Sequence, residues 1–571
     1  MKASDYIASF LHRSGVRCVF ALSGGMITHM LDSLHLAKQI RIVDTHHEQA
    51  AAFAAEGMAR MTGVPGVAMA TSGPGATNLL TGMGSCFFDS SPAVFITGQV
   101  NRQEQKLGRA IRQLGFQETD IVSMAAPITK AAWMAREVGE LPLLLSEAFH
   151  LASSGRPGPV LVDIPMDLQR AELSEADIAS VKSEPVPSAV LPDGLWPELF
   201  EQLQRAERPL VLAGGGIRSG LAGEELRQFV ERLGVPVVHS LMAVDVLPFA
   251  HPLRVGLIGT YGNRWANLAL ARSDFLLVLG SRLDVRQTGA QTGAFKAGRE
   301  IFHVDCEAGE INNRISGCRA VVSSLRPFLQ EAVEQVRKRA LGRCESWLRE
   351  ISSLRAQWPD VCELIGVAGI NPNHFMHQLS QKSASSAAYV VDVGNHQMWA
   401  AQSLELRAEQ RFLTSGGMGS MGFALPAAVG AALAAKGQPV VVVAGDGGFQ
   451  CNIQELQTIV RNKLPLKIVI LNNHCYGMVR QFQESYFEAR YQSTMWGYSA
   501  PDFANVAQAY GIAGRKLSEP ADAEAAISWL WERPQEPSLL EVEIHPYANA
   551  YPKIAFGCSI SEMEPLAKTT G

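Results

Sequence analysis

The segment VVVVAGDGGFQCNIQELQTIVRNKLPLKIVILNN, residues 440–473, decides the predicted fold. Two apolar runs, 440–444 and 468–471, lead directly into Gly445-Asp446-Gly447-Gly448 and into Asn472-Asn473. Between them, apolar residues at 453, 456, 459 and 460 have helical spacing. The segment therefore predicts a strand–helix–strand unit, whose right-handed crossover can place the two strands side by side.

Short apolar runs of this kind alternate with helical patterns along most of the chain, for example GVAMAT, FLLVLGS and AYVVDVG. Such runs are typical of parallel strands that are buried on both faces. We predict an α/β fold of three doubly wound domains with mostly parallel sheets, at 1–178, 190–335 and 370–571. The Pro- and Ser-rich stretch 180–197 is the predicted first linker, and a second boundary is expected near 366–373. The first and last domains are candidates for structural relatives, although their sequences show no obvious repeat.

The composition excludes several classes of protein. The 571 residues carry a net charge of only −5 and no run of Lys or Arg, which argues against a nucleic-acid partner. No apolar run approaches the roughly eighteen residues of a membrane span, and the polar N-terminus does not resemble a signal peptide. The nine cysteines are scattered without a CxxC pair, so we expect reduced thiols, a cytoplasmic location and no structural zinc.

Asp446 and Asn473 follow the two strands at their carboxyl ends, where ligands bind in open α/β sheets. Carboxylate and amide oxygens suit Mg²⁺, and Gly447 and Gly448 can bring backbone N–H groups close to a phosphate. The motif is not a P-loop, so the diphosphate need not belong to a nucleotide. A lone GDG would indicate an ordinary turn with a capping Asp. The GDG followed after 24 residues by NN instead predicts a magnesium–diphosphate anchor.

This GDG-x24-NN pattern resembles the signature of thiamine diphosphate (ThDP) enzymes. The resemblance implies that Asp446, Asn473 and the backbone oxygen of Cys475 are the metal ligands. A wider resemblance, to the acetolactate synthase family, covers nearly the whole chain. It is carried by HHEQAAAFAAEGMAR, TSGPGATN, GFQETD, GRPGPVLVDIP, VDVGNHQMWAAQ, TSGGMGSMGFALPAA and GMVRQFQE.

The resemblance implies roles for several further residues. Glu48 would be the carboxylate near N1′ of the ThDP aminopyrimidine, where it helps to remove the C2 proton. In this family that Glu and the diphosphate site come from different subunits, which implies a homodimer at minimum and a homotetramer as the expected assembly. Met421 would hold ThDP in its bent form, and Gln117 would face the reacting centre, although a solvated loop glutamine is the alternative for Gln117. The remaining implied ThDP contacts are Asn395, His396, Gln397, Gly447, Gly448 and Met478.

The middle domain resembles the FAD-binding domain of the same family. The implied FAD contacts are Gly214, Gly215, Gly216, Arg156, Arg282, Arg286 and Asp305. As a lone motif, AGGGIRSG is weak, because it is not GxGxxG. The stretch GCRAVVSS stands where many members carry an acid, which leaves the contacts on the adenine side undefined.

The chain departs from acetolactate synthases around the expected acceptor pocket. Phe482 replaces the usual Trp, and Met166 replaces a common Lys, whereas Arg286 is retained as a cationic anchor. These changes widen the pocket and remove a carboxylate-binding charge. The C-terminal stretch YPKIAFGCSISEMEP also resembles yersiniose-type synthases, which transfer an acetyl unit from pyruvate to the ketone of a nucleotide-linked deoxysugar.

We therefore expect an enzyme that contains ThDP, Mg²⁺ and FAD. It would decarboxylate pyruvate and transfer the two-carbon unit to a carbonyl acceptor, preferably a bulky ketone such as a keto-sugar. A true acetolactate synthase, with pyruvate as acceptor, and a pyruvate oxidase are the enzyme alternatives. A catalytically silent ThDP-binding partner subunit is the third alternative. Retention of Glu48, Asp446 and Asn473 argues against silence.

Overall fold

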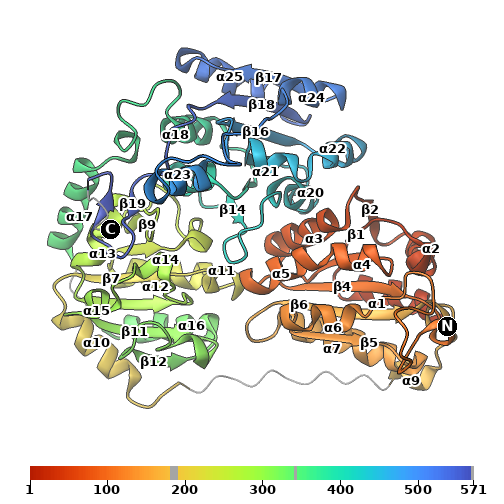
Figure 1. Cartoon of the computed structure of the whole chain (residues 1–571). Helices are drawn as coiled ribbons and strands as arrows, with labels where there is room; N and C mark the ends of the chain where they lie inside the picture. The colour runs from red at the N-terminus through yellow and green to blue at the C-terminus, as the bar shows by residue number, and fades with distance from the viewer. Residues whose placement is uncertain (180–190, 340–343, 567–571) are drawn as a thin grey trace.

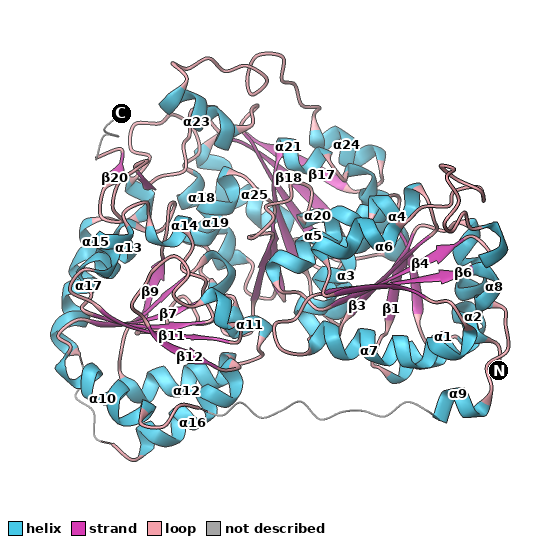
Figure 2. Cartoon of the chain, turned by 60° about the horizontal axis from the view of Figure 1, so that its bottom comes forward, coloured by secondary structure: helices cyan, strands magenta, loops and turns pink. Residues whose placement is uncertain are grey.

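The apolar runs of the sequence form the strands of three sheets in the computed structural model, which describes residues 1–179, 191–339 and 344–566. Figure 1 shows one sheet in each of three domains, and Figure 2 shows helices on both faces of the sheets. The predicted doubly wound α/β class is confirmed. Much of the predicted linker at 180–197 lies outside the described residues, and the predicted domain limits remain predictions. No helix in the described part of the chain is long and apolar enough to cross a membrane.

The first sheet has six parallel strands in the order β2-β1-β3-β4-β6-β5 within the described residues. Its strands are β1 (Cys18–Ala21), β2 (Arg41–Asp44), β3 (Gly66–Ala70), β4 (Ala93–Gln99), β5 (Ala131–Met134) and β6 (Pro159–Pro165). Its helices are α1 (Ala3–Arg13), α2 (Thr28–Ala37), α3 (Glu48–Thr62), α4 (Pro74–Asn78), α5 (Leu80–Asp89), α6 (Ile121–Ala125), α7 (Leu141–Ser153), α8 (Met166–Gln169) and α9 (Glu175–Ala179).

The middle sheet has the order β12-β11-β10-β7-β8-β9 among the residues that the structure describes. Its strands are β7 (Pro209–Ala213), β8 (Val237–His239), β9 (Arg254–Leu257), β10 (Phe275–Leu279), β11 (Glu300–Asp305) and β12 (Arg319–Val322). Its helices are α10 (Leu195–Arg205), α11 (Gly216–Ser219), α12 (Gly223–Leu233), α13 (Arg264–Arg272), α14 (Val285–Thr288), α15 (Thr292–Lys296), α16 (Leu325–Arg337) and α17 (Glu345–Gln357).

The third sheet has the order β14-β13-β15-β16-β18-β17, which repeats the strand order of the first sheet. The expected structural relationship between the first and last domains is therefore confirmed. Its strands are β13 (Ala388–Val391), β14 (Arg411–Thr414), β15 (Val440–Gly445), β16 (Leu466–Asn472), β17 (Ala513–Leu517) and β18 (Ser538–Glu543). Its helices are α18 (Pro372–Lys382), α19 (Asn395–Ser403), α20 (Ala424–Ala434), α21 (Asp446–Gln450), α22 (Leu456–Asn462), α23 (Gly477–Tyr486), α24 (Phe503–Ala509) and α25 (Ala523–Leu530).

The strand–helix–strand unit of 440–473 forms as predicted, with β15 and β16 adjacent and parallel. The connection is interrupted, however, because Asn452 leaves the helical conformation between α21 and α22 and donates its amide to the Gly422 carbonyl at 2.8 Å. Strand β16 also starts two residues before the predicted run. The amine of Lys467, a buried residue of β16, donates to the carbonyls of Arg533 and Glu536, both at 2.7 Å.

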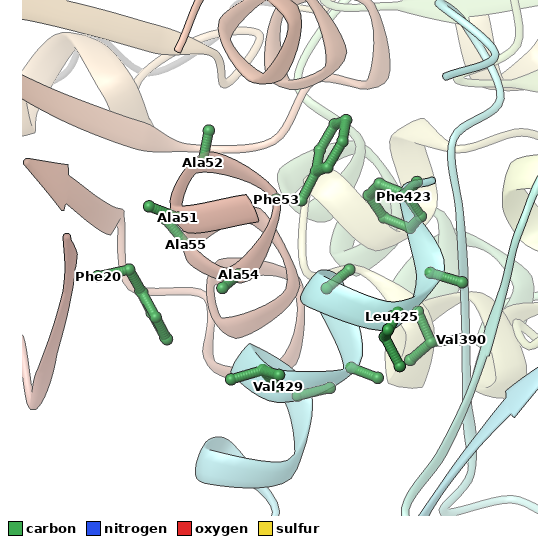
Figure 3. Close-up of a cluster of buried hydrophobic side chains, with 14 of the residues drawn as sticks. Phe20, Ala51, Ala52, Phe53, Ala54, Ala55, Val390, Phe423, Leu425 and Val429 are labelled. Carbon is green, nitrogen blue, oxygen red and sulfur yellow. The ribbon is translucent and has the colours of Figure 1, made fainter. Parts of the chain in front are cut away.

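Helices α3 and α20 join the first and third domains in very close contact (Figure 3). A Cβ atom on Gly57 would lie 2.1 Å from the Ala427 carbonyl oxygen, and one on Gly430 would lie 1.9 Å from that of Ala54. Only glycine permits this approach. The rings of Phe53 and Phe423 pack edge to face at the same contact, with centroids 5.4 Å apart and planes at 73°. The close contact ties α3, which begins at Glu48, to the third domain.

The C-terminal segment returns to the middle domain, as Figure 1 shows. It forms the antiparallel pair β19 (Lys553–Ile554) and β20 (Met563–Glu564). The Ile554 amide donates to the Thr260 carbonyl at 2.8 Å, and the Arg264 guanidinium donates to the Met563 and Glu564 carbonyls. The middle and third domains are thus connected by the end of the chain as well as by their direct contacts.

Candidate functional site

The carboxyl ends of β15 and β16 bring Asp446, Asn473 and Cys475 together, as the sequence predicts. All three residues are buried. The Asn473 amide oxygen lies 3.2 Å from Asp446 Oδ1 and 2.8 Å from the Cys475 carbonyl oxygen. Two arrangements satisfy these atoms: the amide turns over and its NH₂ donates to both oxygens, or a cation lies among the three oxygens. A carboxylate, an amide oxygen and a backbone carbonyl form a donor set that suits Mg²⁺.

Asp446 is the first residue of α21, so its carboxylate stands at a helix N-terminus beside Gly447 and Gly448. Burial raises the pKa of Asp446 to about 6, although hydrogen bonds oppose the shift, chiefly one of 2.8 Å from the Tyr498 hydroxyl to Oδ2. The role of Tyr498 is not predictable from the sequence. It lies 52 residues along the chain from its partner, and no motif marks it.

The predicted contacts Asn395, His396 and Gln397 form the first turn of α19, next to the end of β15. A Cβ atom on Gly445 would lie 2.8 Å from His396 Nδ1, so the glycine leaves room for the ring. Burial lowers the pKa of His396 to about 3, so the imidazole is neutral at neutral pH. His396 Nε2 and Asn395 Oδ1 are buried without a hydrogen-bond partner in the described structure. Buried polar atoms normally have partners, so these atoms indicate a missing ligand or ordered water.

Met421 lies in a loop that is held against α21 by Asp392, another residue that the sequence analysis did not single out. Asp392 accepts hydrogen bonds from the Gly422 amide at 3.0 Å and from the Ala424 amide at 2.9 Å. A Cβ atom on Gly448 would lie 2.6 Å from Asp392 Oδ1. The Met421 side chain is 38% exposed, which makes it available to a ligand rather than part of the core. Met478 lies in the first turn of α23 and is partly buried.

Glu48 begins α3 in the first domain and is buried. Asn78, the last residue of the TSGPGATN motif, donates to Glu48 Oε2 at 2.9 Å. Gln117 lies near this motif in a loop, with a positive φ of 67°, and a Cβ atom on Gly73 would lie 3.0 Å from the Gln117 Cβ. Among the described residues, no hydrogen bond or ion pair joins Glu48 to Asp446, Asn473 or Cys475.

A second site is a cleft of about 430 Å³ that is lined by residues from all three domains. Predicted residues on its walls are Arg156, Gly215, Gly216, Arg282, Arg286 and Asp305. Gly214 lies behind the wall, and a Cβ atom there would lie 2.0 Å from the Gly280 carbonyl oxygen. Gly214 is therefore required for the contact between the ends of β7 and β10, whatever the cleft binds.

Arg156 bridges two domains at the edge of this cleft. Its guanidinium donates to Glu307 at 2.9 Å and to Glu310 at 2.7 Å. Its loop is fixed by the Lys130 amine, which donates to the Arg156 carbonyl at 2.9 Å and to the carbonyls of Leu151 and Ser154. The charge of Arg156 is thus already paired with protein carboxylates. Its side chain shapes the cleft more than it offers a free cation to a ligand.

Phe482 lies on α23 with 49% of its surface exposed. Its ring contacts those of Tyr486 and Phe487, at centroid distances of 4.7 and 5.7 Å, and Tyr486 in turn lies 5.8 Å from Phe556. These four side chains form an aromatic patch. Met166, the first residue of α8, belongs to the first domain and is partly buried.

Comparisons with known proteins agree with this arrangement. Family models described as thiamine pyrophosphate enzyme N-terminal TPP binding domain, central domain and C-terminal TPP binding domain match residues 1–124, 197–332 and 392–542. The acetolactate synthase isozyme 2 large subunit of Escherichia coli is 36% identical over 567 residues, covering 99% of each chain. The acetolactate synthase large subunit of Lactococcus lactis is 35% identical over 561 residues, covering 98% of this chain and 95% of its own. Acetolactate synthase 2 of Nicotiana tabacum is 37% identical and covers 98% of this chain and 85% of its own. The chain therefore belongs to the thiamine diphosphate-dependent, acetolactate synthase-like enzyme family.

Proposed function

We propose that this chain is a ThDP- and Mg²⁺-dependent carboligase that decarboxylates pyruvate and transfers the two-carbon unit to a carbonyl acceptor. The observation that carries the proposal is the cluster of three oxygens from Asp446, Asn473 and Cys475 at the N-terminus of α21. This donor set fits Mg²⁺, which prefers a few protein oxygens together with phosphate oxygens. The α21 N-terminus with Gly447 and Gly448 fits a diphosphate, because its N–H groups and dipole favour negative charge.

When bound, ThDP supplies a nucleophilic carbon and accepts the electrons that decarboxylation releases. The unpartnered His396 Nε2 and Asn395 Oδ1 would contact the diphosphate end, with Gln397 and Met478 nearby. Met421, whose side chain is partly exposed, would support the bent cofactor. These residues bind and orient the cofactor, and the neutral His396 imidazole adds no second charge beside the metal.

Glu48 would exchange a proton between Oε1 and the aminopyrimidine, while Asn78 holds Oε2 in place. Within one chain no hydrogen bond or ion pair joins Glu48 to the Asp446 cluster among the described residues, which supports a site completed by a second copy. We propose a homodimer as the smallest active form and a homotetramer as the assembly. Gln117, which lies close to Gly73 in the motif that carries Asn78, would face the reacting centre.

We also propose that the cleft between the three domains binds FAD, with Gly215, Gly216, Arg282, Arg286 and Asp305 on its walls. The support is its size, its place at the carboxyl ends of β7, β10 and β11, and the glycines that let a ligand approach the backbone. Carboligation is redox-neutral, so FAD would have a structural role in this reaction. A pyruvate oxidase would instead reduce the flavin during turnover.

Two acceptors have support from different observations. The names of the relatives support a second pyruvate, which would make the chain an acetolactate synthase. The exposed Phe482, in place of a larger indole, and Met166, in place of a cation, support a bulky uncharged ketone such as a keto-sugar. Arg286 remains as a cationic anchor for either acceptor. The three metal-binding positions and Glu48 oppose the alternative of a silent partner subunit.

A product screen tests the proposal. The purified enzyme, with ThDP and Mg²⁺, is given pyruvate and a panel of acceptors that includes cyclic ketones and nucleotide-linked keto-sugars. Release of CO₂ together with a new carbon–carbon bond supports a carboligase. The preferred acceptor then shows whether the enzyme is an acetolactate synthase or a carboligase that uses bulky ketones. Acetate or acetyl phosphate formed with flavin reduction would favour an oxidase. The absence of any pyruvate consumption would favour a silent subunit.

A further inference from the structure

The carboxylate of Asp446 has different partners on its two oxygens. Oδ1 faces the Asn473 amide oxygen in the proposed metal cluster, at 3.2 Å. Oδ2 accepts a hydrogen bond of 2.8 Å from the hydroxyl of Tyr498. Oδ1 is therefore directed at the proposed metal position, and Oδ2 is held by the neutral Tyr498 hydroxyl.

The position of Tyr498 is fixed by contacts that do not involve its hydroxyl. Its ring packs edge-on against Tyr476, with centroids 4.7 Å apart and planes at 72°. Tyr476 in turn covers Gly447, where a Cβ atom would lie 2.4 Å from the Tyr476 ring. The Tyr476 amide also donates to the Thr494 carbonyl at 3.1 Å. The two tyrosines therefore hold each other and the start of α21 in register.

The segment that carries Tyr498 is fastened to α23 at a second point. The Gln483 side-chain amide donates to the Gln492 carbonyl at 3.0 Å. This contact and the Tyr476–Thr494 hydrogen bond both hold the stretch that precedes Tyr498. The hydroxyl thus reaches Asp446 from a segment that is held at Gln492, at Thr494 and by the Tyr498 ring itself, so its position does not depend on the hydrogen bond alone.

We propose that Tyr498 is a positioning residue that keeps Asp446 monodentate and so favours Mg²⁺ over Ca²⁺. The inference rests on the proposed function, in which Asp446 is a metal ligand. Mg²⁺ requires near-octahedral geometry with single oxygens, whereas Ca²⁺ accepts bidentate carboxylates and higher coordination numbers. By occupying Oδ2, the hydroxyl prevents the carboxylate from turning both oxygens to the ion. Hydrogen bonds of this kind to a ligand also orient it and contribute to metal affinity.

The test uses the full-length protein with ThDP, with Mn²⁺ as a paramagnetic probe that Mg²⁺ or Ca²⁺ displaces. Tyr498→Phe keeps the ring contact with Tyr476 and removes only the hydroxyl. We expect its affinity for Mg²⁺ to fall by about 10- to 100-fold, the range typical of removing a hydrogen bond to a metal ligand. Its affinity for Ca²⁺ should fall less, because the freed Oδ2 can join the coordination. The ratio of the two affinities should therefore shift toward Ca²⁺.

Tyr476→Phe is the matched control, because in the described structure its ring rather than its hydroxyl makes the contacts, and its Mg²⁺ to Ca²⁺ ratio should stay at the wild-type value. Equal losses for both ions in Tyr498→Phe would mean that the residue acts only through the fold of its segment, and the inference would be wrong. Unchanged affinities would overturn it as well. Asp446→Ala separates failure of this inference from failure of the proposed metal site. If that variant still binds Mn²⁺ like the wild type, the metal site itself is misplaced.

Discussion

The Asn78 side-chain amide donates to Glu48 Oε2 at 2.9 Å, while Glu48 Oε1 faces Gly75. A Cβ atom at position 75 would lie 3.2 Å from Oε1, closer than most side-chain contacts. The carboxylate is thus held through one oxygen, and the glycine leaves space at the other. Among the described residues Oε1 accepts no hydrogen bond, which is the geometry expected of a group that binds a ligand through one oxygen.

Replacing Glu48 with Gln should abolish turnover and leave cofactor binding almost unchanged. The amide cannot exchange a proton with the aminopyrimidine, whereas the Asp446 cluster that would hold the diphosphate is untouched. The measurement is the rate of C2–H exchange of bound ThDP by NMR, together with ThDP affinity from quenching of intrinsic fluorescence. Exchange at the wild-type rate in the variant would refute the role of Glu48. Loss of ThDP binding would show that Glu48 acts mainly in binding.

Two inactive variants should restore activity to each other if each site is shared between two copies. Glu48→Gln and Asp446→Ala are each expected to be inactive as homodimers. In a mixed dimer, one site carries both substitutions and the other carries neither. Because a two-fold dimer has two equivalent sites, the isolated mixed dimer should recover about half of the wild-type activity, and an unseparated random mixture about a quarter. Co-expression with two different affinity tags isolates the mixed dimer for assay. No recovery in a verified mixed dimer would place Glu48 and Asp446 in the same chain's site.

The flavin should stay oxidised during turnover. Carboligation consumes and produces no electrons, so bound FAD has no partner to reduce it. The check is anaerobic mixing of the enzyme with pyruvate, followed at the flavin absorbance in a stopped-flow instrument. Bleaching in proportion to enzyme, at the turnover rate, would instead identify a pyruvate oxidase. Purification without a flavin spectrum, and without recovery on adding FAD, would remove FAD from the proposal.

Stability should depend on pH through His377, which lies between Asp360 and Glu405 at distances of 3.0 and 2.8 Å. Burial alone would lower the pKa of His377, but its hydrogen bonds and charge interactions with these acids raise it above its ordinary value. Burial likewise opposes the ionised form of Asp360, yet its hydrogen bond with His377 lowers its pKa. A raised pKa stabilises the fold below the unfolded value, near 6.5, and this contribution is lost as the pH rises through the folded value. The lowered pKa of Asp360 contributes above about pH 4 and is lost as the pH falls through its folded value.

His377→Gln should therefore destabilise the protein most near pH 6, by about 1.5–3 kcal/mol for the lost charged hydrogen bonds, and less near pH 9. Thermal unfolding of wild type and variant at the two pH values measures the difference. His374→Gln, on the same helix, is a control for the helix itself, because within the described part of the chain the His374 side chain makes no hydrogen bond and its backbone amide donates to Asn371. An equal loss at both pH values would mean that the His377 ring contributes by packing alone.

The sequence predicts the three sheets and the meeting of Asp446 and Asn473 because both depend on local patterns. Buried parallel strands are continuous apolar runs, and ligands that follow two adjacent strands must meet at one edge of the sheet. The pattern does not predict that Lys467 belongs to β16, because its charge interrupts the apolar run. Its amine donates to the carbonyls of Arg533 and Glu536 and to the Ser538 hydroxyl, which lie 66, 69 and 71 residues away.

The contacts that complete the site depend on tertiary structure and have no local signal. Tyr498 reaches Asp446 across 52 residues, and nothing around it distinguishes it from a surface tyrosine. Arg156 stands in a motif of the family, yet its pairing with Glu307 and Glu310 follows from how the first and middle domains meet. Asn78 and Asp392 lie inside the motifs TSGPGATN and VDVGNHQMWAAQ. Each motif indicates the region of the site but does not show which side chain makes which contact.

Phe482→Trp should shift acceptor preference toward 2-keto acids. Phe482 is 49% exposed in the aromatic patch, so its ring leaves open space that an indole would fill. A bulky acceptor would then clash with the indole, at a cost of typically about 1–3 kcal/mol. This corresponds to roughly tenfold or more in relative kcat/KM, since about 1.4 kcal/mol is a factor of ten. A small 2-keto acid does not need the space, and Arg286 still offers it a positive charge.

The experiment compares kcat/KM for a cyclic ketone and for pyruvate as acceptors in the wild type and in Phe482→Trp. Decarboxylation of pyruvate, measured as CO₂ release, should change little, because Glu48 and the Asp446 cluster are untouched. Phe556→Trp is a useful companion, because Phe556 is 73% exposed at the far side of the same patch and so tests whether any added indole has the effect. A ratio that does not move in Phe482→Trp would make Phe482 a packing residue and remove the main support for a bulky acceptor. If the wild type makes only acetolactate and uses no ketone as acceptor, the acceptor is pyruvate, and the space beside Phe482 does not determine the choice of acceptor.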